Sequence, residues 1–152
     1  MSSNMKKILF SFITLIMSVQ AFAQVTASFD FIVSVKGNYP FNGSGKAIVQ
    51  DTRYYVKTGG IEIFCDGSAR WMIDTIAQEV TVETAGNWMD MVVDYDLRYE
   101  GSQISGAVIN LVDGSEVSVA VSDFKESIPS STKFSLDVSK LPDGYIVTDL
   151  RD

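Results

Sequence analysis

The chain has 152 residues, with 19 acidic side chains against 12 Lys and Arg and no histidine. This length allows one domain. The net charge of −7 opposes binding to nucleic acids and electrostatic docking on anionic membranes, because both carry negative charge. The lack of histidine excludes Ser-His-Asp and Cys-His catalysis, and no glycine-rich phosphate motif occurs. We therefore expect no enzyme, no cofactor and no metal centre, although the carboxylates of Glu79 and Glu83 leave acid–base catalysis open as an alternative.

The first 23 residues have the three parts of a secretory signal peptide. Lys6 and Lys7 form a basic start, Ile8–Val19 is apolar, and Ala21-Phe22-Ala23 is an A-x-A cleavage site. An uncleaved membrane anchor is the alternative, but the apolar run is shorter than the roughly 20 residues that span a membrane. We expect cleavage after Ala23 and a soluble periplasmic domain over residues 24–152, with no stable membrane anchor.

Cys65 is the only cysteine, so the chain cannot form an internal disulfide. It follows Ile61 and Ile63 at a spacing of two, which predicts a buried, unreactive thiol on the apolar side of a strand.

Alternation of apolar and polar residues predicts that most of the chain is β-strand. Phe29–Val35 is the first strand, and the glycine-rich stretch Gly37–Gly45 is predicted to be a connection. Asp66-Gly67 predicts a tight hairpin of type I′, and Asp113-Gly114 a second one. The further predicted strands are Lys46–Gln50, Arg53–Lys57, Ile61–Cys65, Arg70–Ile73, Glu79–Glu83, Ala107–Leu111, Glu116–Val121, Lys133–Val138 and Tyr145–Leu150.

One segment breaks this alternation. In Asn87–Tyr95, the residues Trp88, Met91, Val92 and Tyr95 fall at i, i+3, i+4 and i+7, which predicts a short helix. Because strand twist accumulates across a wide sheet, we expect a mainly-β fold: one strongly curved antiparallel sheet of about ten strands, with this helix over its concave face.

The central stretch contains the pattern DG-x-x-x-W followed by EV, in Asp66, Gly67, Trp71, Glu79 and Val80. This pattern resembles the periplasmic lipoprotein carrier family (LolA-like), and the ending TDLRD resembles the usual ending of that family. The chain resembles a short variant, because it lacks the amphipathic helix that commonly precedes the first strand. The resemblance implies an unclosed β-barrel with a helical lid.

The resemblance also implies a function. The protein would bind the acyl chains of a lipoprotein, or another lipid, in a hydrophobic cavity and carry them toward the outer membrane. Its partners would be an inner-membrane releasing complex and an outer-membrane acceptor. The carriers hold the closed lid with an arginine, for which Arg53 is the nearest candidate, although Arg53 also fits an ordinary surface position on a strand.

Large apolar side chains on the predicted inward faces are the candidate cavity residues. They are Phe29, Phe31, Val33, Val35, Ile61, Ile63, Trp71, Ile73, Val80 and Phe134, with Trp88, Met89, Met91 and Val92 on the lid helix. The same residues would equally fill the core of a small sheet that has no cavity. A periplasmic interaction module on a similar scaffold, without bound lipid, is therefore the alternative function.

Overall fold

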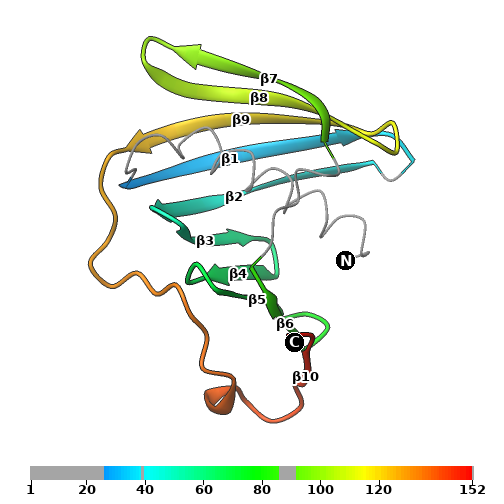
Figure 1. Ribbon diagram of the computed structural model, residues 1–152, viewed down its shortest axis with the longest axis vertical. Coiled ribbons are helices and arrows are strands. Elements are labelled where there is room, and N and C mark those ends of the chain that lie inside the picture. Colours follow the sequence, from blue (N-terminus) through cyan, green and yellow to red (C-terminus); the bar gives the residue numbers. More distant parts are fainter. Residues whose placement is uncertain (1–25, 39, 86–91, 152) are drawn as a thin grey trace.

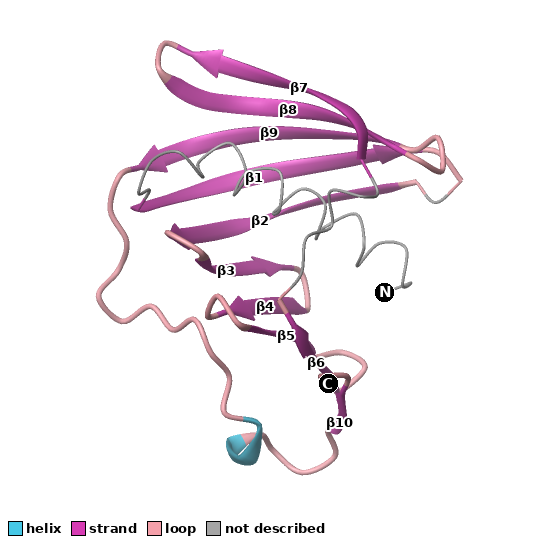
Figure 2. Ribbon diagram, in the orientation of Figure 1, coloured by secondary structure: helices cyan, strands magenta, loops and turns pink. Residues whose placement is uncertain are grey.

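The computed structural model describes residues 26–38, 40–85 and 92–151. These residues form one mainly-β unit with a single ten-strand sheet (Figures 1 and 2). Within them, the one helical element is a 3-10 turn at Val138–Lys140. The strands are β1 (Thr26–Lys36), β2 (Phe41–Gln50), β3 (Arg53–Thr58), β4 (Ile61–Cys65), β5 (Ala69–Asp74), β6 (Glu79–Thr84), β7 (Val92–Glu100), β8 (Gln103–Leu111), β9 (Glu116–Lys125) and β10 (Ile146–Asp149).

The sheet combines two antiparallel meanders, β1 to β6 and β7 to β9, which are joined by an antiparallel ladder between β1 and β9. The strand order is β10-β6-β5-β4-β3-β2-β1-β9-β8-β7. β10 pairs with β6 in parallel, so the sheet is mixed rather than wholly antiparallel as predicted.

The predicted strong curvature and barrel-like form are wrong, because the sheet is neither closed nor strongly curled. Closure requires the two edge strands to approach each other and pair. Here β7 and β10 form opposite edges, and Figure 1 shows them at opposite ends of the molecule.

The two faces of the sheet carry separate hydrophobic clusters. One side of the sheet, which we call the Phe31 face, holds the larger cluster. Its residues are Phe29, Phe31, Val33, Val35, Ala47, Val49, Tyr54, Val56, Ile61, Ile63, Cys65, Met72, Ala107, Ile109, Leu111, Val117 and Val119. The opposite side, which we call the Trp71 face, holds a smaller one, with Ile73, Val80 and Val82 buried against Phe64, Trp71, Leu136, Leu141 and Tyr145. The segment 126–145, which we call the strap, supplies the last three of these side chains and joins β9 to β10.

The predicted helix at Asn87–Tyr95 is wrong from Val92 onward, and its first five residues lie outside the described part of the chain. Val92–Glu100 forms β7, which pairs with β8 from Val92 opposite Leu111 to Glu100 opposite Gln103. Val93-Asp94-Tyr95-Asp96-Leu97 alternates at the period of a strand, and pairing with β8 satisfies its backbone groups.

The predicted connection Gly37–Gly45 is also wrong over most of its length, since Phe41–Gln50 is one continuous strand. A Cβ atom on Gly45 would lie 2.8 Å from the Phe31 ring and 2.2 Å from the carbonyl oxygen of Lys57. Gly45 therefore serves the close approach of β2 to its neighbours rather than a turn.

Two smaller predictions need correction as well. Lys133–Val138 is not a strand but part of the strap, where Leu136 packs on the Trp71 face. The Asp66-Gly67 hairpin exists, but its turn spans three residues and only Gly67 has a positive φ, of 98°. The Asp66 carboxylate accepts hydrogen bonds from the backbone N–H groups of Ser68 (2.9 Å) and Ala69 (2.8 Å), which closes this turn without type I′ geometry.

Candidate functional site

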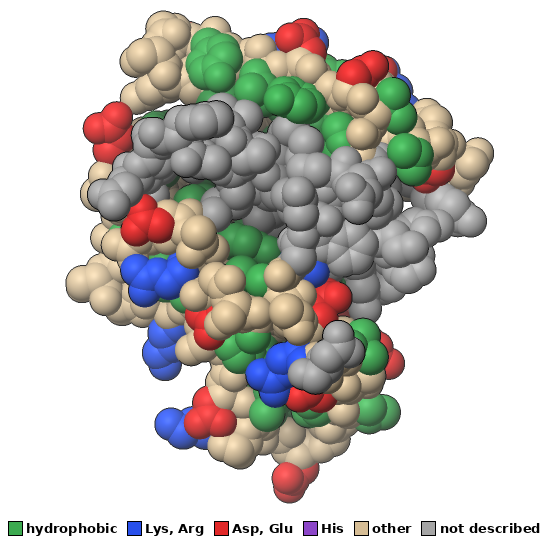
Figure 3. All heavy atoms as spheres, viewed as in Figure 1, with side chains coloured by type: hydrophobic (Ala, Val, Ile, Leu, Met, Phe, Trp, Pro, Cys, Tyr) green, Lys and Arg blue, Asp and Glu red, His purple; other side chains and the backbone are tan. Residues whose placement is uncertain are grey.

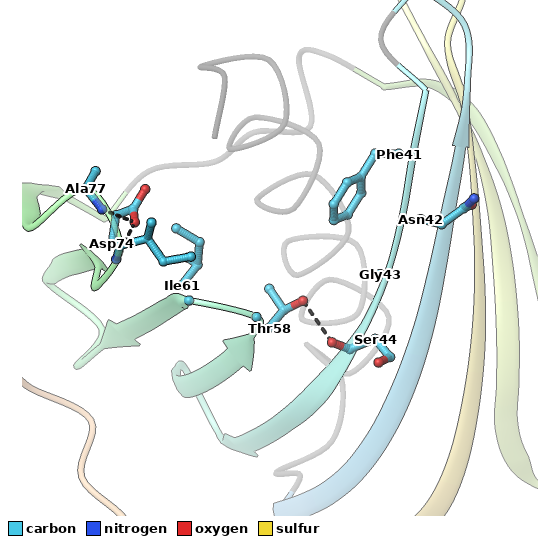
Figure 4. Close-up of a pocket in the computed structure, with 11 residues that line it drawn as sticks. Phe41, Asn42, Gly43, Ser44, Thr58, Ile61, Asp74 and Ala77 are labelled. Atoms are coloured by element: carbon cyan, nitrogen blue, oxygen red, sulfur yellow. Dashed lines mark hydrogen bonds between the residues drawn. The ribbon is translucent and has the colours of Figure 1, made fainter.

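One cavity lined by described residues lies where several strand ends meet, and its volume is about 480 Å³. The start of β2 forms one wall, and the β3–β4 and β5–β6 turns form the other (Figure 4). Its lining residues are Phe41, Asn42, Gly43, Ser44, Thr58, Gly59, Gly60, Ile61, Asp74, Ile76 and Ala77.

Two polar side chains of this cavity, Thr58 and Asp74, form hydrogen bonds with the backbone around it. Thr58 Oγ1 donates a hydrogen bond to the carbonyl oxygen of Ser44 at 2.9 Å. Asp74 Oδ1 accepts from the N–H groups of Ile76 (3.0 Å) and Ala77 (2.9 Å), which shapes the β5–β6 turn. These bonds hold the two walls in shape and leave the apolar lining available for contact with a ligand.

The apolar lining comes from both walls. Phe41 is half-buried and points from β2 into the space, opposite Ile61 on β4 (Figure 4). Ile76, in the β5–β6 turn, is 84% exposed. An isoleucine this exposed at the rim of an apolar cavity is a surface that a hydrophobic ligand could cover.

Ile61 is the one predicted cavity residue that lines this space. The predicted residues of β1 and Ile63 are on the same face, but they are 0–3% exposed and form the packed core. The centre of the Phe31 face is therefore buried, and the cavity lies to one side of it, at the strand ends. Sequence reasoning missed Phe41, because the surrounding glycines suggested a turn.

Three other predicted cavity residues, Trp71, Ile73 and Val80, lie on the opposite face. The ladder between β4 and β5 pairs Ile63 with Met72 and Phe64 with Trp71. Since directly opposed residues point to the same face, Met72 joins the Phe31 face and Trp71 does not. Ile73 and Val80 pair with each other on the Trp71 face.

A second hollow, of about 300 Å³, lies between the strap and the Trp71 face. Its floor includes Ile48, Phe64 and Tyr55, and the strap contributes residues from Pro129 to Lys133. The Tyr55 hydroxyl donates a hydrogen bond to the Glu62 carboxylate. Burial, together with this bond and the negative charge of Glu62, raises the pKa of Tyr55 well above its usual value.

The strap also contacts Arg53, the candidate latch residue, for which a surface position on a strand was the alternative. The Arg53 guanidinium lies over the ring of Phe134, 4.9 Å from its centroid, and Ser28 Oγ donates to the carbonyl oxygen of Ser127 at 2.9 Å. Arg53 and Phe134 thus hold the strap against the Trp71 face, away from the cavity at the strand ends. Of the predicted lid residues, Val92 begins β7, while Trp88, Met89 and Met91 lie outside the described residues.

A buried polar group that sequence reasoning missed lies on the Phe31 face. Arg70 is 2% exposed and forms an ion pair with Glu83 across the β5–β6 ladder at 3.3 Å. Next to it, Tyr54 lies opposite Cys65. Burial, with a smaller contribution from Cys65, raises the pKa of Tyr54 to about 12.

The thiol of Cys65 is buried as predicted, and burial raises its pKa. A thiol in this state is a poor nucleophile.

The sequence did indicate that Arg70 points to the same face as Met72, because the two residues are separated by two positions. The burial of Arg70, however, depends on its ion pair with Glu83 and on tertiary packing.

Over the residues that the structure describes, no three or more Cys, Asp or Glu side chains come close enough together to hold a metal ion. The same part of the chain contains no helix that is long and apolar enough to cross a membrane.

No known protein-family model matches the sequence, and a search of curated proteins also finds no match. The chain is therefore classified by its structure alone, as a mainly-β protein with one ten-strand, mostly antiparallel sheet.

Proposed function

We propose that the chain is an exported carrier that binds an acyl chain of a lipoprotein, or of another lipid, and shields it from water. The observation that supports this proposal is the 480 Å³ cavity, with Phe41, Ile61 and the exposed Ile76 on its walls. Its volume lies within the roughly 300–1,000 Å³ of ordinary small-molecule sites.

The energetics of transfer favour such a site. Each methylene that leaves water contributes about 0.8 kcal/mol, so burying a few methylenes against Ile76 and Phe41 would retain an acyl chain. The ligand would lie at the strand ends and would not enter the packed centre around Phe31 and Ile63. The site would thus bind part of an acyl chain, and the sheet would not have to open.

The alternative, an interaction module that holds no lipid, draws support from a different observation. The centre of the Phe31 face is filled by side chains that are nearly inaccessible to solvent, among them Ile63 and Val117. The two functions differ in what Ile76 does: a carrier needs it for ligand capture, whereas a module with a filled core does not.

A charged substitution at the rim of the cavity distinguishes the carrier from the interaction module. Ile76→Glu should weaken binding of a fluorescent fatty acid at least about tenfold, because a carboxylate would have to lose water beside the acyl chain. Stability should change little, since Ile76 is so exposed. Val112→Glu is the matched control, because Val112 is 64% exposed and does not line the cavity.

Mass spectrometry of protein purified without detergent provides a second readout. The carrier proposal expects lipid or acylated protein to copurify with the unmodified chain and with Val112→Glu, and to be lost from Ile76→Glu. Equal binding by both variants, or no bound lipid and no fatty-acid binding in the unmodified chain, would refute the proposal.

A further inference from the structure

The outer edge of the sheet at β7 carries a self-complementary pattern of side chains. In the described part of the chain, β7 forms one ladder, with β8, and is the last strand in the sheet order. Tyr95 is 47% exposed and Tyr99 is 55% exposed. Figure 3 shows hydrophobic and acidic side chains next to one another along the upper edge of the molecule, where Figure 1 places β7.

Odd- and even-numbered residues of β7 have different chemistry. Tyr95, Leu97 and Tyr99 point to the Phe31 side of the sheet, because Tyr95 and Leu97 are paired with Ile109 and Ala107. The even-numbered residues point to the other side and are charged: Asp94, Asp96, Arg98 and Glu100. Neither Asp96 nor Arg98 forms an ion pair with another described residue.

We propose that β7 pairs with β7 of a second copy of this chain, antiparallel and centred on Leu97, so that the two sheets form one continuous sheet. A two-fold axis perpendicular to the sheet pairs residues of the same face, and centring it on Leu97 places Tyr95 opposite Tyr99 and Asp96 opposite Arg98. Each of these contacts occurs twice in the dimer, which is the isologous arrangement of two-fold interfaces.

The geometry of β7 suits this register. Its pairing with β8 is unbroken from Asp94 opposite Asn110 to Arg98 opposite Gly106, and irregularities lie at both ends of this stretch. The register centred on Leu97 includes this stretch and extends two residues beyond it, to Glu100, whereas a register centred on Asp96 would place two aspartates opposite each other. A register shifted to Arg98 would place two arginines opposite each other, and like charges directly opposite destabilise a pair of strands.

One pair in this register is unfavourable and provides a test. Asp94 would lie opposite Glu100 at both ends of the contact, although Asp94 already accepts a hydrogen bond from Asn110 Nδ2 at 2.6 Å. The dimer should therefore be weak and reversible. Replacing Glu100 with Lys converts two repulsive pairs into attractive ones and should tighten the dimer by at least about threefold.

The experiment is sedimentation velocity on the purified protein, from low micromolar to near-millimolar concentration. The unmodified chain should dimerise as its concentration rises. Asp96→Arg and Arg98→Asp should each weaken the dimer at least about tenfold, because each places like charges opposite one another. The double variant Asp96→Arg with Arg98→Asp restores opposite charges and should recover dimerisation.

Glu126→Arg is the control, because it changes the net charge by the same amount as Asp96→Arg at an exposed site on the strap. It should dimerise as the unmodified chain does. Circular dichroism and thermal melting of each variant confirm that it is folded. A monomer at every concentration, a double variant no better than the single ones, or a Glu100→Lys variant that does not tighten the dimer would overturn the proposal.

Discussion

Met72 lies directly opposite Ile63 in the ladder between β4 and β5, and this pairing places Trp71 on the other face of the sheet from Ile63. Trp71 is therefore separated from the cavity at the strand ends. It packs instead with the cluster of Ile73 and Val80 beneath the strap.

Trp71→Ala should lower stability without affecting fatty-acid binding. Trp71 is half-buried, so its loss should cost about 2 kcal/mol, less than the 3–5 kcal/mol of a fully buried tryptophan. Urea unfolding measures this cost. Met72→Ala, at a residue that is 3% exposed, should cost at least as much, about 2–5 kcal/mol. Loss of fatty-acid binding in a stable Trp71→Ala protein would contradict this assignment of faces.

Gly45→Ala should destabilise the protein more than Gly43→Ala. The added methyl group at position 45 meets the backbone carbonyl of Lys57 at 2.2 Å, so β2 or β3 must move, at a cost of about 1–3 kcal/mol. At position 43 the nearest contact is the tip of the Phe41 ring at 2.7 Å, which can rotate away. Thermal melting of the two variants tests the difference, and equal melting temperatures would show that β2 adjusts freely.

Stability should fall at alkaline pH because of Tyr54. Burial raises the pKa of Tyr54 from 10.0 to about 12, so the folded chain keeps a proton that the unfolded chain loses. This contribution is fully present below pH 10 and is lost as pH rises to about 12, by roughly 3 kcal/mol.

Tyr54→Phe should flatten that part of the pH dependence of the unfolding free energy. The substitution should also remove the ionisation step near pH 12 from the absorbance titration of the tyrosines. An unchanged pH profile in Tyr54→Phe would mean that other groups cause the alkaline loss.

Arg53→Ala should loosen the strap without unfolding the sheet. The contact of its guanidinium with Phe134 is partly exposed, and such cation–π contacts contribute about 0.5–1 kcal/mol. Backbone amides at Ser131 and Thr132 should then exchange hydrogen faster, while those of β4 keep their rates. Arg53→Lys retains the charge and should have a smaller effect. Faster exchange throughout the sheet would show that the strap is part of the global fold.

Local alternation was enough to predict most strands. Ile61–Cys65 begins and ends where predicted, because this mostly apolar run is bounded by Gly59-Gly60 before and by Asp66-Gly67 after. The segment from Val92 was misread because its apolar residues fit both a helical and a strand period, and only the partner strand β8 decides between them. The glycines of β2 were misread because a glycine marks either a turn or a close approach.

The residues of the candidate site were much harder to predict from the sequence. Ile61 was predicted, but Phe41 and Ile76 come from a strand and a turn that meet only in the folded sheet. Trp71 and Ile73 were assigned to the wrong face, although the two-residue Asp66-Gly67 hairpin that the sequence predicted would already have placed Met72, and not Trp71, on the face of Ile61. Hairpin register is a relation between two strands, and a list of alternating residues along one strand does not contain it.

The sequence by itself determined the mainly-β class, the approximate number of strands and the absence of histidine-dependent chemistry, because side-chain alternation and composition are local properties. The tertiary structure decided the parallel docking of β10 on β6, the open edges, the two separate hydrophobic faces and the cavity at the strand ends. Each of these depends on contacts between residues far apart in the chain. Their free energies are set by which surfaces come together, which no short stretch of sequence encodes.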